Sequence, residues 1–374
     1  MENNQVQKKI LIFSTAYLPM VGGAEIAVKE ITDRLPSWKF DMITPKIQFG
    51  LPKFEKIGNI NVYRIGFGCN FDKFLLPVFG LFKANRLNKR NNYNLTWSIM
   101  ASYGGFLGSF FKKFHSDKPF LLTLQEGDAP ELILEKVGFF KSSFKKIFKR
   151  ADYIQSISSF LDNWAEKMGI DSNKRVIVPN GVDSKKFATE LIHEHIHDHK
   201  IILTVSRLVK KNGVDDLIKA GQYLNFDFKI IIIGSGKNEK KLKKLVKKLK
   251  LENKVIFQGQ IKYGELPKYY ALADVFVRPS LSEGLGNVFL EAMACGLPVI
   301  GTPVGGIPDF LEDRKTGLFC KVNNPQSIAK KIEEILKDNK LRKNIVNNGL
   351  NLIKEKYTWN GIAKKMERVF DKLL

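Results

Sequence analysis

Apolar runs of strand length alternate with amphipathic helical stretches along the whole chain. Runs such as Ile230–Ile233 are apolar at every position, a pattern typical of strands that are buried on both faces of a parallel sheet. Helical periods, as at 24–35, 106–114 and 238–250, separate these runs in both halves of the chain. Each half is therefore predicted to be a parallel sheet covered by helices. The predicted strands are 9–16, 40–44, 61–66, 94–99, 120–125, 153–158, 175–180, 201–206, 228–234, 254–259, 274–280 and 297–302.

The break between the halves falls at 183–200, which has no clean period and is rich in charge and histidine. We expect an N-terminal Rossmann-like domain at 1–185 and a C-terminal one at 200–356, and we treat 357–374 as a separate last helix. The fold class is α/β, with two doubly wound domains facing a central cleft. Ligands of such sheets bind beyond the carboxyl ends of the strands, so the loops that follow strands are the candidate sites.

Composition narrows the function only in part. The length of 374 residues favours two domains, and the net charge of +23 implies an anionic partner such as nucleic acid, a phospholipid surface or a phosphorylated ligand. Three cysteines form neither a disulfide framework nor a zinc pattern, which favours a reducing cytosol. We find no signal peptide and no uncharged apolar stretch long enough to cross a bilayer, so a cytoplasmic protein is expected.

The loop after 274–280 carries the strongest candidate residues. Glu283 follows the strand directly, and Glu291 lies about one turn inside the next helix, which Asn287 can start. Gly284 and Gly286 let the backbone approach a ligand, and two carboxylates near a helix start could hold the hydroxyls of a sugar and a ribose. The alternative is a capped helix with one solvent-facing Glu and one Glu paired with Lys.

Four weaker candidates remain. Arg207 and the lysines after it leave a strand end and suit diphosphate neutralisation, although a solvated basic turn explains them equally well. Gly22 and Gly23 open a helix, as a phosphate or acceptor cradle or simply as a helix start. Residues 125–128 form a polar cluster at a strand end, which is a candidate catalytic or acceptor group or a capping loop. The alternating histidines at 193–199 could bind a metal in a strand, but a surface segment is favoured and no metal site is predicted.

The ordered set of these segments resembles the retaining GT-B glycosyltransferases of family four. The resemblance spans most of the chain and is carried by residues 17–25, 176–187, 204–220, 230–242, 257–319 and 357–366.

The resemblance implies that the second domain binds a nucleotide diphosphate sugar, linked to UDP or GDP, without a metal or another cofactor. It implies that Glu291 holds the ribose, that Glu283 holds the donor sugar, and that Arg207 with a nearby Lys neutralises the diphosphate. It also implies that the last helix crosses back to the first domain. Gly284, Leu285, Gly286 and Asn287 would approach the sugar and phosphates through their backbone.

Two positions depart from the family pattern. Gln125 stands where relatives commonly carry a cleft histidine, so it would supply hydrogen bonds only, or Glu126 or Asp128 would take part of that role. Asn212 stands where a lysine usually precedes the helix glycine, and Lys211 is our substitute.

Phenylalanine and lysine are mixed in three segments of the first half, at 67–83, 106–115 and 137–150. In the last of these, Phe140, Phe144, Ile147 and Phe148 recur at helical spacing between basic residues. Basic amphipathic helices bind anionic interfaces, whereas core packing is the default for any single Phe. We expect peripheral association with the inner face of the cell membrane and a glycan or lipid-linked acceptor there, as in cell-envelope polysaccharide synthesis.

Two alternatives stay open. Another GT-B activity, such as an epimerase or a phosphorylase, would share the fold, but we find no support for a phosphorylase. A non-catalytic protein that binds nucleic acid through its basic surface would share the charge, although no helix-turn-helix, zinc-finger or RNP-like segment supports nucleic acid as a partner.

Overall fold

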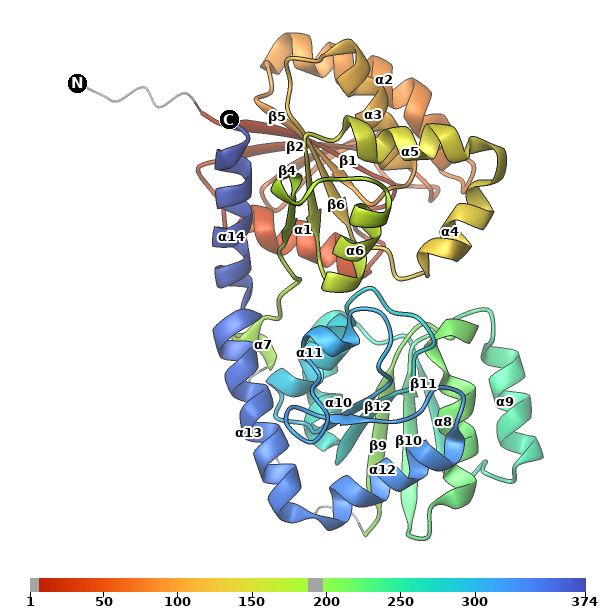
Figure 1. Cartoon of the computed structure of the whole chain (residues 1–374). Coiled ribbons are helices and arrows are strands. Elements are labelled where there is room, and N and C mark those ends of the chain that lie inside the picture. The colour runs from red at the N-terminus through yellow and green to blue at the C-terminus, as the bar shows by residue number, and fades with distance from the viewer. Residues whose placement is uncertain (1–6, 188–197) are drawn as a thin grey trace. The chain divides into compact units, whose positions relative to one another are not determined.

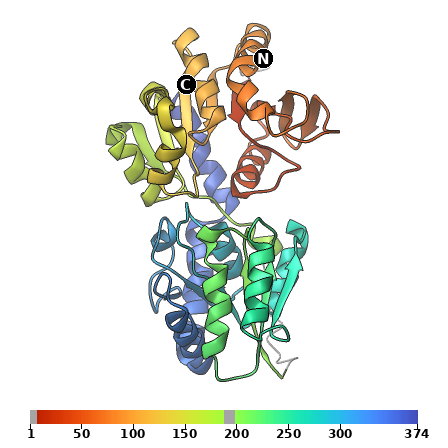
Figure 2. The same cartoon turned by 90° about the vertical axis from the view of Figure 1, so that its right-hand side faces the viewer.

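The computed structural model describes residues 7–187 and 198–374. The chain divides into two compact units (Figures 1 and 2). Unit 1 comprises Met1–Asn180 and Trp359–Leu374, and unit 2 comprises Gly181–Thr358. We predicted domain boundaries at residues 185, 200 and 357 from the sequence. In the structure the first stretch of unit 1 ends at Asn180, five residues before 185, and its second stretch begins at Trp359. The histidines at 193, 195 and 197 lie outside the described residues.

Unit 1 contains one sheet with the strand order β3-β4-β2-β1-β5-β6-β7-β8 within the described residues. All neighbouring strands pair in parallel except β3 and β4. The strands are β1 (Lys9–Ser14), β2 (Lys39–Pro45), β3 (Phe54–Ile57), β4 (Ile60–Ile65), β5 (Leu95–Ile99), β6 (Phe120–Leu124), β7 (Tyr153–Ser156) and β8 (Arg175–Ile177). The helices are α1 (Gly23–Asp33), α2 (Asp72–Asn91), α3 (Tyr103–Phe114), α4 (Pro130–Val137), α5 (Lys141–Arg150), α6 (Ser159–Lys167) and α14 (Trp359–Lys372).

Helices cover both faces of the unit 1 sheet, as continuous apolar strands require. Along β1, Ile10 and Ile12 join the cluster under α1 and α14, whereas Leu11 and Phe13 join the cluster under α2 and α3. Successive residues of a strand point to opposite faces, so an uninterrupted apolar run serves both layers. The prediction of a doubly wound parallel sheet is confirmed for this half.

Unit 2 is a second parallel sheet, with the order β11-β10-β9-β12-β13-β14 within the described residues. Its strands are β9 (Lys200–Val205), β10 (Phe228–Ile233), β11 (Val255–Gly259), β12 (Val275–Arg278), β13 (Val299–Gly301) and β14 (Leu318–Phe319). Its helices are α7 (Ser184–Phe187), α8 (Val214–Ala220), α9 (Glu239–Lys248), α10 (Leu266–Leu272), α11 (Asn287–Ala294), α12 (Pro325–Lys337) and α13 (Asn339–Lys356). In α9, Leu242 and Val246 are buried and the lysines are exposed, so the prediction that this helix packs its apolar stripe on the sheet is confirmed.

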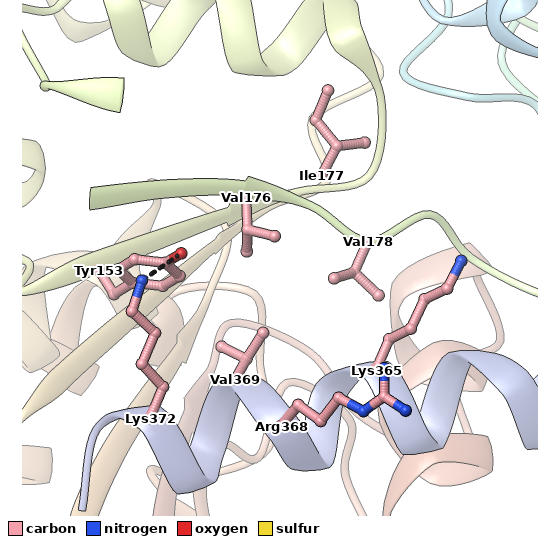
Figure 3. A pocket seen from close by; sticks show the side chains of 8 residues that line it. All are labelled: Tyr153, Val176, Ile177, Val178, Lys365, Arg368, Val369 and Lys372. Carbon is pink, nitrogen blue, oxygen red and sulfur yellow. Dashed lines mark hydrogen bonds between the residues drawn. The ribbon is translucent and has the colours of Figure 1, made fainter. Parts of the chain in front are cut away.

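Helix α14 packs on unit 1 although it ends the chain. The ring of Phe370 lies 5.1 Å from the ring of Trp97 in β5, and Trp38 donates from its indole N–H to Glu367 at 3.1 Å. A hollow of about 260 Å³ lies between this helix and strands β7 and β8. Figure 3 shows the side chains that line it and the hydrogen bond that Lys372 donates to the Tyr153 hydroxyl, which is 3.0 Å long. The lining is an apolar seam edged by basic side chains, and none of our predicted site residues belongs to it.

Some elements carry too little pattern to be predicted from the sequence, among them strands β3 and β14 and helix α2. Strands β3 and β14 have four and two residues, too short to show a period. Helix α2 contains Pro77 and is apolar on more than one side in its first half, so its helical period is blurred.

The structure corrects our prediction for the amphipathic stripe at 137–150. Phe144, Ile147 and Phe148 are at most 1% exposed, and Phe144 and Phe148 pack against Trp164 of α6. The prediction that this stripe faces a membrane is wrong for these three residues, because the default of core packing applies. Phe140 lies before α5 and is exposed.

Each sheet has one topological switch point, where the chain order reverses. It lies between β1 and β5 in unit 1 and between β9 and β12 in unit 2. Loops that leave the carboxyl ends of these strands diverge there and leave room for a ligand. The predicted site residues belong to these loops or to loops next to them.

Candidate functional site

The loops after β9 and β12 meet at the switch point of unit 2. The backbone N–H of Leu281 donates to the carbonyl of Lys211 at 2.6 Å. Gly213 has a φ of +66°, and a Cβ atom there would lie 1.9 Å from the carbonyl oxygen of Pro279. Only glycine fits this approach, so this glycine is a condition for the two loops to pack together.

Arg278, the last residue of β12, is the charged centre of these loops. Its guanidinium lies 2.6 Å from the carboxylate of Glu283 and donates to the side-chain oxygen of Asn212 at 3.0 Å. Asn212 in turn donates to the backbone carbonyl of Arg207 at 2.6 Å. Arg278 was not among our predicted site residues, and its signal was an arginine at the end of an otherwise apolar strand.

Glu283 forms an ion pair, but one of its carboxylate oxygens can still accept a hydrogen bond. Its side chain is 13% exposed, and one oxygen accepts from the Gly284 N–H at 3.2 Å. The other oxygen, beside Arg278, lacks a hydrogen bond of good angle within the described residues, as does Nε of Arg278. A buried oxygen that is held near a cation but lacks a directed hydrogen bond is suited to receive one from a ligand hydroxyl.

Glu291 belongs to helix α11, and it is almost completely buried. It accepts a hydrogen bond from the hydroxyl of Tyr270 at 2.9 Å. Burial raises the pKa of Glu291 to about 7, while the hydroxyl of Tyr270 and the charges of Arg278 and Lys186 oppose that rise. Arg278 thus acts on both acidic side chains, which the structure brings to the same end of the sheet. Neither is solvent-facing or paired with lysine through an ion pair that the structure shows, so our alternative of a plain capped helix is wrong.

The turn between them opens α11. Gly286 has a φ of +98° and caps the helix, which begins at Asn287 as expected. Gly284 and Leu285 are buried beneath this turn, and Asn287 is half-buried. The first N–H groups of an α-helix lack intrahelical partners and carry a partial positive charge, so this end of α11 favours an anion.

The basic residues after β9 are more exposed. Arg207 is exposed, and no hydrogen bond or ion pair of its guanidinium occurs among the residues that the structure describes. Lys211 is half-buried. Both lie on the loop that Asn212 joins to Arg278, so the structure places the predicted cations on the same loop system as the acidic pair.

In unit 1, Gln125 and Glu126 directly follow β6 and are both 8% exposed. Gln125 accepts from the Asn180 side chain at 3.5 Å, which is a long contact. One oxygen of Glu126 accepts from the backbone N–H of Ala101 at 2.5 Å, and the other has no partner within the described residues. Burial raises the pKa of Glu126 to about 7. Asp128 instead pairs with Lys136 on the surface of α4.

The glycines at the start of α1 are less suited to an anion than expected. Gly22 caps the helix and Gly23 begins it, but Glu25 stands in the first turn. A Cβ atom on Gly22 would lie 2.5 Å from the Glu25 carboxylate. A carboxylate at a helix N-terminus already satisfies the partial positive charge there, so an uncharged acceptor group fits this end better than a phosphate.

Within 7–187 and 198–374, no group of three or more His, Cys, Asp or Glu side chains is arranged to hold a metal ion.

This geometry defines a class: two Rossmann-like domains, each with polar groups gathered at its switch point. Residues 21–186 match the family model of Glycosyltransferase Family 4, and residues 187–352 match that of Glycosyl transferases group 1. Together the two models cover most of the chain, which belongs to the GT-B glycosyltransferases of family four.

Relatives and solved structures agree with this assignment. An uncharacterized glycosyltransferase of Methanocaldococcus jannaschii is 27% identical, over 98% of this chain and 99% of its own length. A GDP-mannose-dependent alpha-(1-6)-phosphatidylinositol monomannoside mannosyltransferase of Mycolicibacterium smegmatis is 31% identical, over 53% of this chain and 56% of its own length. The sucrose-phosphate synthase of Thermosynechococcus elongatus superposes with a TM-score of 0.86 at 22% identity, covering 98% of this chain and 99% of that one. Anabaena HepE in complex with UDP-glucose gives a TM-score of 0.80 at 19% identity, covering 97% and 99%.

Proposed function

We propose that the chain is a retaining hexosyltransferase that uses a UDP- or GDP-linked sugar and acts on a glycan or lipid-linked acceptor. The observation that best supports a donor site in unit 2 is the position of Arg278 at the switch point. Arg278 lies between Glu283 and Asn212 and near Glu291. Retention of configuration belongs to the proposal because the family resemblance implies it.

The proposed donor site assigns each group a task. Glu291 accepts hydrogen bonds from the ribose hydroxyls, and Glu283 accepts from the donor sugar. Arg207, Lys211 and the N-terminus of α11 stabilise the negative charge that grows on the diphosphate as the sugar leaves. Fixed charges and dipoles need no reorganisation in the transition state, so they lower its energy. Gln125 and Glu126 of unit 1 are the proposed acceptor-side groups.

The proposed acceptor draws on the relatives. The mannosyltransferase of M. smegmatis is named for a phosphatidylinositol monomannoside. A Campylobacter jejuni relative, 30% identical over 59% of this chain and 62% of its own length, is named for a diphospho-undecaprenol-linked sugar. We therefore place the reaction at the inner face of the cell membrane, to which the protein binds peripherally. No helix in the described part of the chain has the length and hydropathy that a bilayer crossing requires.

Nucleotide binding tests the donor site. A ligand that binds only the folded state raises the melting temperature in proportion to the logarithm of its concentration over Kd. We expect UDP or GDP to raise the melting temperature of the wild type, and Glu291→Gln to reduce that rise strongly. Glu252→Gln is the matched control, because Glu252 is exposed in the same unit.

One result would favour the nucleic-acid alternative. If no nucleoside diphosphate stabilised the protein, and duplex DNA bound it with a steep salt dependence, the basic surface would be the functional one.

A further inference from the structure

Helix α2 exposes large apolar side chains where a soluble helix normally exposes charge. Its inner face packs against α3 and β2 through small and aliphatic residues, among them Leu76, Gly80 and Ala84. On the opposite face, Phe71 at the N-cap and Phe74, Phe79 and Phe82 are each 52–69% exposed. Apolar patches that remain exposed in a folded protein mark contact surfaces.

Two loops extend this surface. Phe49 follows β2 and is 86% exposed, and Phe67 follows β4 and is 80% exposed. The loops touch, because a Cβ atom on Gly68 would lie 2.8 Å from the Cα atom of Phe49. We call Phe49, Phe67, Phe71, Phe74, Phe79 and Phe82 the aromatic face.

The exposed charged residues of α2 are all basic and lie near its C-terminal end. After Phe82 the same outer face continues as Arg86, Lys89 and Arg90, all exposed. The acidic residue of the helix, Asp72, is buried and accepts from the backbone N–H groups of the loop before it. At a rise of about 1.5 Å per residue, the apolar stretch from Phe71 to Phe82 is about 17 Å long. A basic turn follows it, and α2 places no carboxylate beside that turn.

The aromatic face lies next to the proposed acceptor loops. The ring of Phe74 is 5.1 Å from that of Tyr103, the first residue of α3. Just before it in the chain, Ala101 donates to Glu126, and Ser102 shares a hydrogen bond of 2.7 Å with Thr15. The surface therefore runs up to the switch point of unit 1.

We propose that the aromatic face enters the interfacial layer of an anionic phospholipid bilayer, with the basic end of α2 on the lipid headgroups, and that the acceptor's lipid part stays in that bilayer while its sugar reaches the switch-point loops. The bilayer is the occupant because exposed phenylalanine and neighbouring cations together match its apolar interior and anionic surface. The acceptor part of this proposal rests on the proposed function, whereas the bilayer part rests on the exposed side chains of α2 and its flanking loops. This assigns the membrane contact to α2 and its flanking loops, not to the buried stripe of α5.

Vesicle flotation of the full chain tests the proposal. Phosphatidylcholine vesicles with and without phosphatidylglycerol are the probes. We expect the wild type to float with the anionic vesicles, and Phe71→Ser/Phe79→Ser/Phe82→Ser to reduce the bound fraction at least about tenfold. Added salt should weaken wild-type binding without abolishing it, because only the basic end is screened.

Two matched variants control for surface hydrophobicity and charge. Phe139→Ser/Phe140→Ser removes two exposed phenylalanines from the turn before α5, and Lys240→Ser/Lys244→Ser/Lys247→Ser removes charge from α9. Both should float like the wild type. Flotation lost in either control but kept in the α2 variant would overturn the proposal, as would equal binding to neutral and anionic vesicles.

Two further measurements distinguish a membrane-binding face from a folding defect and from a dimer interface. The UDP- or GDP-induced melting shift of the α2 variant should equal that of the wild type, which shows that its fold and donor site are intact. If the wild type floats but no nucleotide stabilises it, the proposed transferase activity fails and the bilayer contact of the aromatic face stands. If the wild type does not float and the α2 substitutions instead abolish a concentration-dependent dimer in sedimentation, a second copy covers the face and the proposal is wrong.

Discussion

The guanidinium of Arg278 lies 2.6 Å from the carboxylate of Glu283, with both side chains largely withdrawn from solvent. Removing one member of such a pair leaves the other charge buried without a partner, which costs far more than the net value of the pair. The same guanidinium also holds Asn212, so one side chain stabilises two loops.

Arg278→Ala should lower the free energy of unfolding by about 3 kcal/mol or more, because Glu283 would be left as an unpaired buried charge. The double variant Arg278→Ala/Glu283→Ala should cost less than the sum of the two single changes. Urea unfolding measures both. Lys243→Ala breaks an exposed pair with Glu239 and should cost less than about 1 kcal/mol. Additive costs at Arg278 and Glu283 would contradict this account.

Glu126 should make stability fall as pH rises. Burial raises the pKa of its carboxyl to about 7 from 4.5, so the folded state holds a proton that the unfolded state has released. Stability therefore decreases between about pH 4.5 and pH 7. Glu126→Gln cannot ionise, so relative to the wild type it should gain up to about 3 kcal/mol across this interval.

Chemical denaturation of the wild type and Glu126→Gln at several pH values measures that difference, in which the contribution of Glu291 cancels. The exposed Glu131→Gln should follow the wild type at every pH. A gap between Glu126→Gln and the wild type that does not vary with pH would show that Glu126 ionises as it does in an unfolded chain.

Gly213→Ala should be strongly destabilising for a steric reason. The new methyl group would lie 1.9 Å from the carbonyl oxygen of Pro279, so the loops after β9 and β12 would have to separate. Gly259 has a similar φ of +74° but no atom within 4 Å of a built Cβ. Gly259→Ala should therefore cost only the backbone strain of about 1 kcal/mol, and Gly213→Ala considerably more. Melting temperatures of the two variants provide the comparison; equal losses would refute the close approach.

Phe144→Ala should lower the free energy of unfolding by about 3–5 kcal/mol, because it opens a cavity beside Phe148 and Trp164. Phe140→Ala, four residues earlier, removes a side chain that is 70% exposed and should change stability by less than about 0.5 kcal/mol. Urea unfolding of both variants tests which residues of the 137–150 segment belong to the core. Similar effects would mean that the stripe is not buried as described.

Sequence patterns predicted the regular elements where the chain repeats one pattern over several residues. The continuous runs of β1 and β10 indicated strands buried on both faces, and both lie inside parallel sheets. The glutamates at 283 and 291 were identified as candidates because they follow a strand end and a helix start. Whether they bind a donor sugar stays a prediction.

Arg278 shows why the rest of the site could not be found this way. Its partners, Asn212 and Glu283, lie 66 residues before it and five residues after it, and the sheet order brings the three together. Spacing along the chain does not specify that order. Phe144 shows a second limit of prediction from sequence. An amphipathic pattern indicates that one face of a helix is apolar, but it does not indicate what covers that face.

By itself, the sequence determined the α/β class, the division into two similar halves and the strand-end loops that are candidate sites, since hydrophobic period and turn residues act over a few neighbouring positions. Only the tertiary structure decided which carboxylates are buried, which cation joins them and which phenylalanines stay exposed on α2. Burial and charge pairing depend on segments distant in the chain, and these meet only when the sheets and their covering helices have packed.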